Sequence, residues 1–273
     1  MLIDGKKIAG KIFEDIKKEV SRMSKKPALG ALLVGDNSSS IRYIEQKKKW
    51  AEYVGIKFIL KKLPEHVSEN EILSTIESFN TDDNISGYIV QLPLPSHIDE
   101  KKIIKSISPK KDVDGFHPEN QGKLMIGDKT GFSPCTPAGI LELLKSTEID
   151  YIGKQVVVIG RSNIVGKPIT TLLINEGATV ISCNSKTPNI RKFTIDADIV
   201  ISAAGKPGLL TLDMIKKDAI VIDVGFTVIE GKIYGDADTH NMDLAGVKVT
   251  PVPGGVGPLT VAMLMKNTLK SGK

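Results

Sequence analysis

The chain has 273 residues, of which 41% are apolar and 25% are charged, and its formal net charge is +5 at pH 7. This composition is typical of a soluble globular protein with one large core or two modest ones, and it excludes disordered and collagen-like chains. No apolar run approaches the about 20 residues that cross a bilayer, so we expect no membrane partner. The lysines do not gather with aromatic side chains in a known module, so we expect no nucleic-acid partner.

The cysteines and the N-terminal segment indicate the compartment. Cys135 and Cys183 lie far apart and form no CxxC pair, so neither a disulfide framework nor a structural zinc site is expected. The first twenty residues have an amphipathic helical pattern without the continuous apolar stretch of a secretory signal. We therefore expect a cytoplasmic protein.

Apolar runs rich in β-branched residues alternate with helical stretches along the chain. Several runs are continuous, as expected of parallel strands buried on both faces. The expected strands are Ala28–Val34, Ile56–Leu60, Ser86–Gln91, Gln155–Gly160, Ala178–Cys183, Asp198–Ala203, Ala219–Val224 and Val247–Val249. The expected helices cover residues 5–23, 40–54, 68–79, 100–106, 137–147, 166–176 and 258–270. This alternation predicts an α/β fold with mostly parallel sheets and with ligands at the carboxyl ends of the strands.

A domain boundary is expected in the stretch Lys111–Pro137, which is rich in Gly, Pro, Asp and Asn and has no sustained period. We predict one domain over residues 1–137 and a second, Rossmann-like and doubly wound, over residues 138–257. The last helix, within residues 258–273, is expected to return to the first domain.

The segment Gln155–Gly177 has the pattern of a buried strand, a turn and an amphipathic helix. Gly160 stands at the turn and Gly166 opens the helix, an arrangement that points backbone N–H groups and the helix dipole at an anion such as a pyrophosphate. Arg161 and Ser162 stand where the usual three-glycine fingerprint, with its tighter turn, has glycine. An ordinary βα turn therefore stays an alternative.

The strand after this helix indicates which dinucleotide is bound. An NAD site usually carries an acid at the end of that strand to bind the ribose 2′-hydroxyl. Here the strand is followed by Ser185, Lys186 and Thr187 and by no carboxylate. Arg161 is close by in the first turn, which contains Gly160. These side chains suit a 2′-phosphate, so NADP is favoured over NAD.

Further candidates for chemistry lie in the first half of the chain. Tyr43 and Lys47 stand at i and i+4 of an expected helix, so they share a face that is either a solvated surface or the lining of a cleft. Gln91 ends an expected strand, where ligand contacts are usual. The two aspartates of Lys111–Phe116 suit an Asx turn, with a metal as the weaker alternative.

Glycine is unusually dense in Pro251–Thr260, which permits close backbone approach to a ligand. The four histidines are scattered, and none has a serine or cysteine partner in a nucleophile motif, so a hydrolase triad is not expected.

Six segments in order resemble the methylenetetrahydrofolate dehydrogenase/cyclohydrolase family of one-carbon metabolism. They are VGDNSSSIRYIEQKKK, GYIVQLPLP, KDVDGFHPENQG, PCTPAGI, VVVIGRSNIVGKP and PVPGGVGPLT. The resemblance implies oxidation of 5,10-methylenetetrahydrofolate with NADP and hydrolysis of the 5,10-methenyl product to 10-formyltetrahydrofolate, which places the enzyme near purine biosynthesis. It also implies a homodimer and substrates that can carry polyglutamate tails.

The resemblance also implies roles for individual residues. Lys47 would be the main catalytic group, Gln91 would hold and tune it, Tyr43 would stack against the folate, and Asp114 would accept hydrogen bonds from the pterin. Other substrate-binding residues would be Ser40, Pro93, Pro253, Gly254 and Gly255. The cofactor-binding residues would be Gly160, Arg161, Ser162, Val165, Gly166, Ser185, Lys186, Thr187, Ala204 and Gly205. No metal is implied.

Departures from the family pattern and rival functions stay open at this point. Asn184 stands where many relatives have His, and Phe226-Thr227 stand where Ile-Asn is common, which bears on the choice between NADP and NAD. The alternatives are a monofunctional dehydrogenase, a non-catalytic NADP- or folate-binding relative, and a two-domain dehydrogenase of another substrate such as shikimate.

Overall fold

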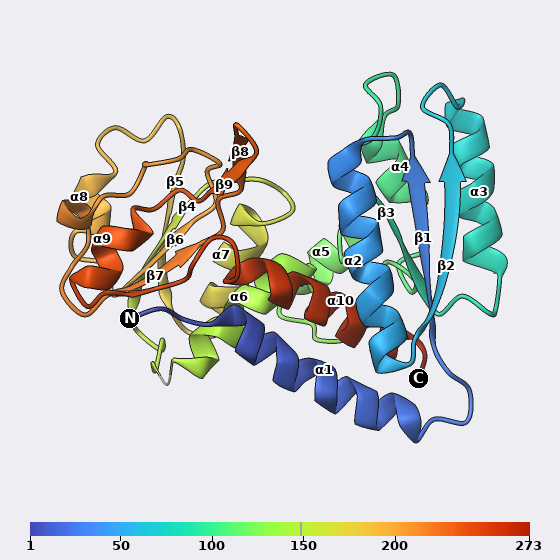
Figure 1. Cartoon of the computed structure of the whole chain (residues 1–273), viewed down its shortest axis with the longest axis horizontal. Helices are drawn as coiled ribbons and strands as arrows, with labels where there is room; N and C mark the ends of the chain where they lie inside the picture. Colours follow the sequence, from blue (N-terminus) through green and yellow to red (C-terminus); the bar gives the residue numbers. More distant parts are fainter. Residues whose placement is uncertain (148) are drawn as a thin grey trace. The chain divides into compact units, whose positions relative to one another are not determined.

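The computed structural model describes residues 1–147 and 149–273. The chain divides into two units (Figure 1): unit 1 comprises Met1–Gly10 and Thr136–Thr260, and unit 2 comprises Lys11–Cys135 and Val261–Lys273. Both contain parallel β-sheets with helices, which confirms the α/β fold class. No helix of the described residues is long and apolar enough to cross a membrane.

Unit 2 is built on a three-stranded parallel sheet in the order β2-β1-β3. The central strand β1 is buried at all seven positions, as its continuous apolar sequence predicts. An apolar core forms against α3 and α4 and includes Leu32, Ile72 and Ile103. The elements are β1 (Ala28–Val34), α2 (Ser38–Val54), β2 (Lys57–Leu63), α3 (Glu69–Thr81), β3 (Gly87–Val90), α4 (Glu100–Ser106) and α5 (Pro118–Met125).

Three helices have residues in both units, namely α1 (Gly5–Ser21), α6 (Cys135–Ser146) and α10 (Val256–Ser271). Within unit 2, α1 packs on α2 through Phe13 and Trp50, whose rings stack at a centroid distance of 3.9 Å. The C-terminal turns of α10 also belong to unit 2, where the Ser271 hydroxyl donates to the Lys110 carbonyl oxygen at 3.0 Å.

Unit 1 contains a five-stranded parallel sheet in the order β10-β7-β6-β4-β5. Strand β5 lies on one side of β4 and β6 on the other, so the winding direction reverses at β4, as in a doubly wound Rossmann-like sheet. A two-stranded antiparallel hairpin, β8–β9, lies outside this sheet. The elements are β4 (Gln155–Ile159), α7 (Gly166–Asn175), β5 (Thr179–Cys183), α8 (Arg191–Thr194), β6 (Ile199–Ser202), the 3₁₀ helix η1 (Leu212–Met214), β7 (Ile220–Asp223), β8 (Thr227–Ile229), β9 (Lys232–Tyr234), α9 (Thr239–Leu244) and β10 (Lys248–Val249).

The structure contains elements that the sequence does not predict, among them the short helices α8 and α9. The stretch Lys111–Pro137, expected to lack regular structure, contains helix α5, whose first residue is Pro118. The ring Nδ1 of His117 caps this helix by accepting from the Glu119 N–H at 3.1 Å, and eight residues are too few to establish a clear period. The hairpin β8–β9 was also not predicted, because each of its strands has only three residues.

Candidate functional site

The first candidate site lies in unit 2 and is organised by the start of helix α2. The Asn37 side chain caps this helix by accepting from the backbone N–H groups of Ser39 and Ser40 at 3.0 and 3.2 Å. The cap places Tyr43 and Lys47 one turn apart on the same face. The helix therefore presents a phenol and a lysine side chain on one side, as the spacing predicts.

Lys47 and Gln91 form the central pair of this site. The Lys47 Nζ donates to the Gln91 Oε1 at 2.9 Å, although 44 positions separate the two residues. The Gln91 side chain is itself held, because its Nε2 donates to the Leu92 carbonyl oxygen at 2.6 Å. Its backbone N–H donates to the Leu32 carbonyl oxygen at 2.9 Å. The lysine is thus tied to the carboxyl end of β3, where a parallel sheet positions its ligands.

Asp114 adds a carboxyl group to the same site. Its side chain is half-buried, and burial raises its pKa above the usual value. The charge of Lys47 and a hydrogen bond from the Cys135 thiol act in the opposite direction, whereas the nearby Asp112 charge raises the pKa further. Burial also raises the pKa of the Cys135 thiol well above its usual value. Lys47, Asp114 and Cys135 therefore act on one another at close range.

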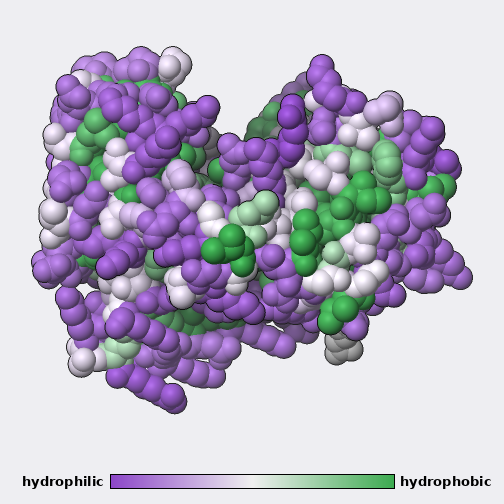
Figure 2. Space-filling view, turned by 180° about the vertical axis from the view of Figure 1, so that it is seen from behind, coloured by the Kyte–Doolittle hydropathy of each residue, from purple (hydrophilic) through white to green (hydrophobic). Residues whose placement is uncertain are grey.

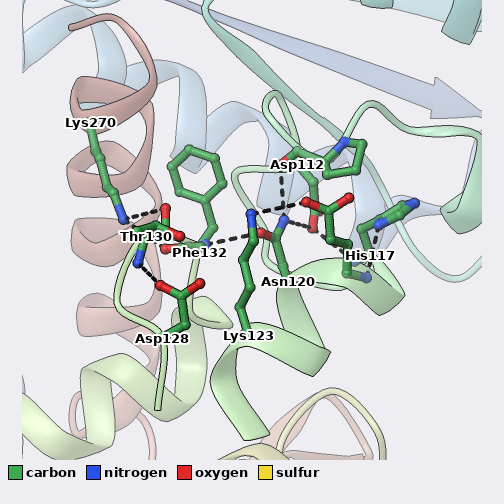
Figure 3. Close-up of polar contacts among 11 residues, drawn as sticks. Asp112, His117, Asn120, Lys123, Asp128, Thr130, Phe132 and Lys270 are labelled. Atoms are coloured by element: carbon green, nitrogen blue, oxygen red, sulfur yellow. Dashed lines mark hydrogen bonds and ion pairs between the residues drawn. The ribbon is translucent and has the colours of Figure 1, made fainter. Parts of the chain in front are cut away.

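A second aspartate, Asp112, shapes the loop that carries Asp114 (Figure 3). One carboxylate oxygen accepts from the Phe116 N–H at 3.2 Å, and the other accepts from the His117 N–H and the Asn120 amide, both at 2.8 Å. The Asn120 Oδ1 in turn accepts from the Phe132 N–H at 3.2 Å. Asp112 is 1% exposed, so it organises the loop from within rather than forming the local Asx turn expected from the sequence.

Ser40, Tyr43 and Pro93 lie on elements that border this pair. The Ser40 side chain is 2% exposed, and its hydroxyl oxygen is one of two buried side-chain polar atoms in the described residues without a hydrogen-bond partner. Such a group is costly to leave unpaired, which suits a hydroxyl that meets a ligand. Burial raises the pKa of Tyr43, with the Arg42 charge opposing. Pro93 is exposed and follows Leu92 through a cis peptide bond.

The second candidate site lies in unit 1 at the turn after β4. Gly160 adopts φ +121°, a conformation that side chains rarely adopt, and a Cβ there would lie 2.9 Å from the Ala203 carbonyl carbon. A Cβ on Gly166 would lie 2.8 Å from the Arg161 backbone nitrogen. The two glycines let the turn, the neighbouring β6 loop and the start of α7 approach closely. The residues present therefore fit a dinucleotide pyrophosphate at the switch point of the sheet.

Ser162 and Val165 complete this turn. The Ser162 hydroxyl oxygen accepts from the N–H groups of Val165 and Gly166 at 3.2 and 3.3 Å. Val165 is the residue before the first helical residue of α7 and has no side-chain cap of its own. The serine therefore supplies the N-terminal cap, a role that the sequence analysis did not separate from cofactor binding.

The turn after β5 suits a phosphorylated ribose. Asn184 and Thr187 close this turn, because the Thr187 hydroxyl accepts from the Asn184 N–H at 2.9 Å. Ser185 and Lys186 are exposed at its tip, and Arg161 is exposed in the β4 turn. No carboxylate stands at residues 184–187, so nothing there opposes a 2′-phosphate.

Two buried aspartates that the sequence analysis did not assign shape the loops after β6 and β7. The Asp236 carboxylate accepts from the Ser202 hydroxyl at 2.7 Å, the Ala204 N–H at 2.8 Å and the Lys206 N–H at 2.7 Å. It therefore fixes the Ala204-Gly205 backbone, which was predicted to bind cofactor. Of the two aspartates, only Asp223 carries a sequence signal for a role in shaping these loops, because it is an acid at the end of an expected strand.

Asp223 lies at the end of β7 and is 1% exposed. Its carboxylate accepts from the N–H groups of Gly225, Asp236 and Ala237 at 2.8–2.9 Å. Burial raises the pKa of Asp223 to about 6, although these hydrogen bonds oppose the shift.

The glycine-rich segment before α10 lies in unit 1. The Gly255 N–H donates to the Pro251 carbonyl oxygen at 2.8 Å, and Gly254 adopts φ +115°. Pro253 is exposed beside them. Their expected contacts with substrate stay a prediction. Across residues 1–147 and 149–273, no three His, Cys, Asp or Glu side chains gather in a group that could hold a metal ion.

Comparison with protein families identifies both halves of the chain. A family model described as "Tetrahydrofolate dehydrogenase/cyclohydrolase, catalytic domain" matches residues 3–114. A second, described as "Tetrahydrofolate dehydrogenase/cyclohydrolase, NAD(P)-binding domain", matches residues 134–273.

Individual relatives match over the full length. The "Bifunctional protein FolD" of Bacillus subtilis is 50% identical over 276 aligned residues, which cover 100% of this chain and 97% of the relative. The crystal structure of the bifunctional methylenetetrahydrofolate dehydrogenase/cyclohydrolase from Campylobacter jejuni has a TM-score of 0.97 at 47% identity and covers 100% and 98% of the two chains. The Trypanosoma brucei enzyme, complexed with NADP cofactor and inhibitor, has a TM-score of 0.93 at 37% identity and covers 100% and 97%.

Proposed function

The chain belongs to the tetrahydrofolate dehydrogenase/cyclohydrolase family, and from this premise we propose which of its residues carry out the two reactions. The protein oxidises 5,10-methylenetetrahydrofolate to 5,10-methenyltetrahydrofolate with NADP and hydrolyses the product to 10-formyltetrahydrofolate. The observation that supports the residue assignment best is the Lys47–Gln91 hydrogen bond beside Asp114. The family match excludes the shikimate alternative.

In the cyclohydrolase step, Lys47 acts on the proton of the attacking water. The water oxygen adds to the methenyl carbon, and one water proton is transferred to the Lys47 amine or, through it, to solvent. The bond between that carbon and N5 then breaks, N5 takes a proton, and the carbon stays on N10 as a formyl group. Gln91 supports this role because its Oε1 holds the Lys47 Nζ in one place at 2.9 Å.

The remaining residues of unit 2 bind and orient the folate. The carboxyl group of Asp114, whose pKa is raised by burial, accepts hydrogen bonds from the pterin. The Tyr43 ring stacks against the folate, and the unpaired Ser40 hydroxyl and the exposed Pro93 border it. The substrate contacts expected of Pro253, Gly254 and Gly255 stay a prediction.

In the dehydrogenase step the chain aligns reactants and needs no strong acid or base. The cofactor that this unit would hold is NADP, which would supply the acceptor for the hydride of the methylene carbon. Gly160 and Gly166 leave room for a pyrophosphate to approach the backbone of this turn, and Val165 lies in the same turn. Arg161, Ser185, Lys186 and Thr187 would hold the 2′-phosphate, and Ser162, Ala204 and Gly205 would be further contacts to the cofactor.

The test is the variant Lys47→Met, assayed for both activities. Loss of a positioned acid–base group lowers a rate by about a hundredfold or more, so cyclohydrolase turnover should fall by that factor. Dehydrogenase turnover should fall less, because hydride transfer does not pass through the lysine. The matched control is Lys48→Met, the adjacent lysine, whose side chain is 55% exposed. Full cyclohydrolase turnover in Lys47→Met would overturn the assigned role.

We further propose that the chain forms a homodimer through unit 1. Figure 2 shows hydrophobic side chains gathered over this unit. Ile152 and Ile174 are 68% and 56% exposed there, and β5 is an edge strand of the five-stranded sheet. A second copy of the chain would cover these residues. Sedimentation equilibrium should give twice the mass of the chain, and Ile174→Lys should shift the protein toward the monomer.

Two finer statements about substrate and compartment are also proposals. The formal charge of +5 suits substrates that carry anionic γ-glutamate tails, so we expect a lower KM for the triglutamate than for the monoglutamate, and a smaller difference at high salt. Cys135 and Cys183 are both free and buried, which suits the cytoplasm. Cell fractionation tests this location.

A further inference from the structure

The carboxyl-terminal helix α10 brings a buried amide to the segment that carries Asp114. Asn267 is 8% exposed, and its Nδ2 donates to the Val113 carbonyl oxygen at 2.9 Å and to the Ser133 carbonyl oxygen at 3.1 Å. The same nitrogen lies 3.7 Å from the Cys135 Sγ. A primary amide has two N–H donors, and here they join two backbone segments that are 20 positions apart in the sequence.

One of these segments leads to Asp114 and the other leads to Cys135. Val113 directly precedes Asp114, and its carbonyl oxygen also accepts from the Cys135 thiol at 3.3 Å. Ser133 stands two residues before Cys135, whose side chain is near enough to Asp114 to act on the pKa of its carboxyl group. The Asn267 amide therefore fixes the backbone directly before Asp114 and the backbone two residues before Cys135.

The space between the two segments leaves no room for adjustment. Gly115 adopts φ +75°, and a Cβ at this position would lie 2.7 Å from both the Pro134 nitrogen and the Ser133 carbonyl carbon. Beyond it, the Asp112 carboxylate holds the N–H groups of Phe116 and His117. Asn267 thus holds the backbone that precedes Asp114, and the Asp112 carboxylate holds the backbone that follows it.

We propose that Asn267 is a positioning residue for the folate-binding carboxyl group of Asp114. It aligns Asp114 by joining the Val113 and Ser133 backbones, and so sets affinity for the folate substrate without touching it. The proposal rests on the assignment of Asp114 as the pterin-binding group. A buried carbonyl that loses its donor is costly, so removal of the amide should let both segments move toward new partners.

Helix α10 has other attachments to unit 2, so its docking does not depend on Asn267. The Lys270 Nζ donates to the carbonyl oxygens of Lys129, Thr130 and Gly131 at 3.0, 3.2 and 2.7 Å, and Figure 3 shows its reach into this loop. The same ammonium lies 5.2 Å from the Phe132 ring centroid. Loss of the Asn267 amide is therefore expected to loosen the Asp114 segment while α10 stays in place.

The test compares Asn267→Leu with Thr268→Val in the full-length enzyme. Leucine branches at Cγ as asparagine does and has no donor, although it is larger. Thr268 is the next residue, is 0% exposed and donates only within the helix, to the Leu264 carbonyl oxygen at 2.8 Å. In Asn267→Leu we expect the KM for methylenetetrahydrofolate to rise about tenfold or more while the KM for NADP stays within about twofold. In Thr268→Val both KM values should stay near wild type.

A second readout does not depend on activity. The Cys135 thiol is buried and lies against the Asn267 amide, so loosening of the segment should speed its alkylation by iodoacetamide about tenfold or more. Peptide mapping separates Cys135 from Cys183. The alkylation rate of Cys183, which lies in unit 1, should not change.

The outcomes separate this inference from the assignment of Asp114. Asp114→Asn is measured alongside, and an unchanged folate KM in that variant would overturn the assignment of the carboxyl group itself. A raised folate KM in Asp114→Asn but not in Asn267→Leu would overturn the positioning role alone. Equal losses in Asn267→Leu and Thr268→Val, or a parallel rise of both KM values, would overturn it as well. If the leucine variant does not fold, Asn267→Ser, which keeps one donor, is judged by the same criteria.

Discussion

The start of helix α7 has so little room that one added methyl group should disable the cofactor site. In Gly166→Ala the new Cβ would lie 2.5 Å from the Gly160 carbonyl carbon and 2.8 Å from the Arg161 nitrogen, and closer still to the Gly160 oxygen. Real Cβ atoms essentially never approach other heavy atoms within 3.0 Å. All of these neighbours are backbone atoms, so no side chain can rotate away, and the turn or the helix must move.

The size of the effect follows from what has to move. Overpacking of this kind typically costs about 1–3 kcal/mol of folding free energy. The backbone that shifts is also the backbone that faces the pyrophosphate, and a displacement of about 1 Å in a positioned group can cost about a hundredfold. We expect the Kd for NADP to rise by about ten- to a hundredfold, which corresponds to about 1.4–2.7 kcal/mol.

The assay is NADP binding by fluorescence or calorimetry, together with thermal unfolding. The control is Gly10→Ala, also in unit 1, because a Cβ there meets nothing within 4 Å. In the interior of α1 this change should stabilise the protein by about 0.5–1 kcal/mol without altering NADP affinity. A Gly166→Ala protein that binds NADP within twofold of wild type would refute the argument that this turn holds the pyrophosphate by close backbone approach.

Two further predictions concern unit 1. The pKa of Asp223 is raised from 3.8 to about 6 in the folded protein, so its contribution to stability is fully present below about pH 4 and is lost as the pH rises through 6. Compared with Asp223→Asn, the wild-type protein should lose about 3 kcal/mol of unfolding free energy in urea titrations between pH 4 and pH 7, and parallel pH profiles of the two proteins would contradict this. Arg161→Ala and Lys186→Ala should each raise the KM for NADP about tenfold and leave the KM for NAD nearly unchanged, and equal losses for both cofactors would show that these side chains do not contact the 2′-phosphate.

Much of the fold could be predicted from the sequence because its signals are local. The seven-residue apolar run Ala28–Val34 has the composition of a strand buried on both faces, and the structure buries all seven residues. The spacing of Tyr43 and Lys47 places them on one helix face regardless of what the helix packs against. The glycines at 160 and 166 are needed for backbone approach within one turn, and a strand–turn–helix pattern reveals them.

The contacts that make these residues a site depend on the tertiary structure. Lys47 meets Gln91 across 44 positions, and Asn267 meets Val113 across 154. Asp236, which follows β9, accepts from the Ala204 N–H across 32 positions. Helix periodicity, capping and turn preferences act over a few residues, whereas these pairs form when separate elements pack together and bury their polar groups against one another. The sequence by itself therefore determined the elements and the residue types that carry the chemistry, and the packing of those elements decided which side chains hold them in position.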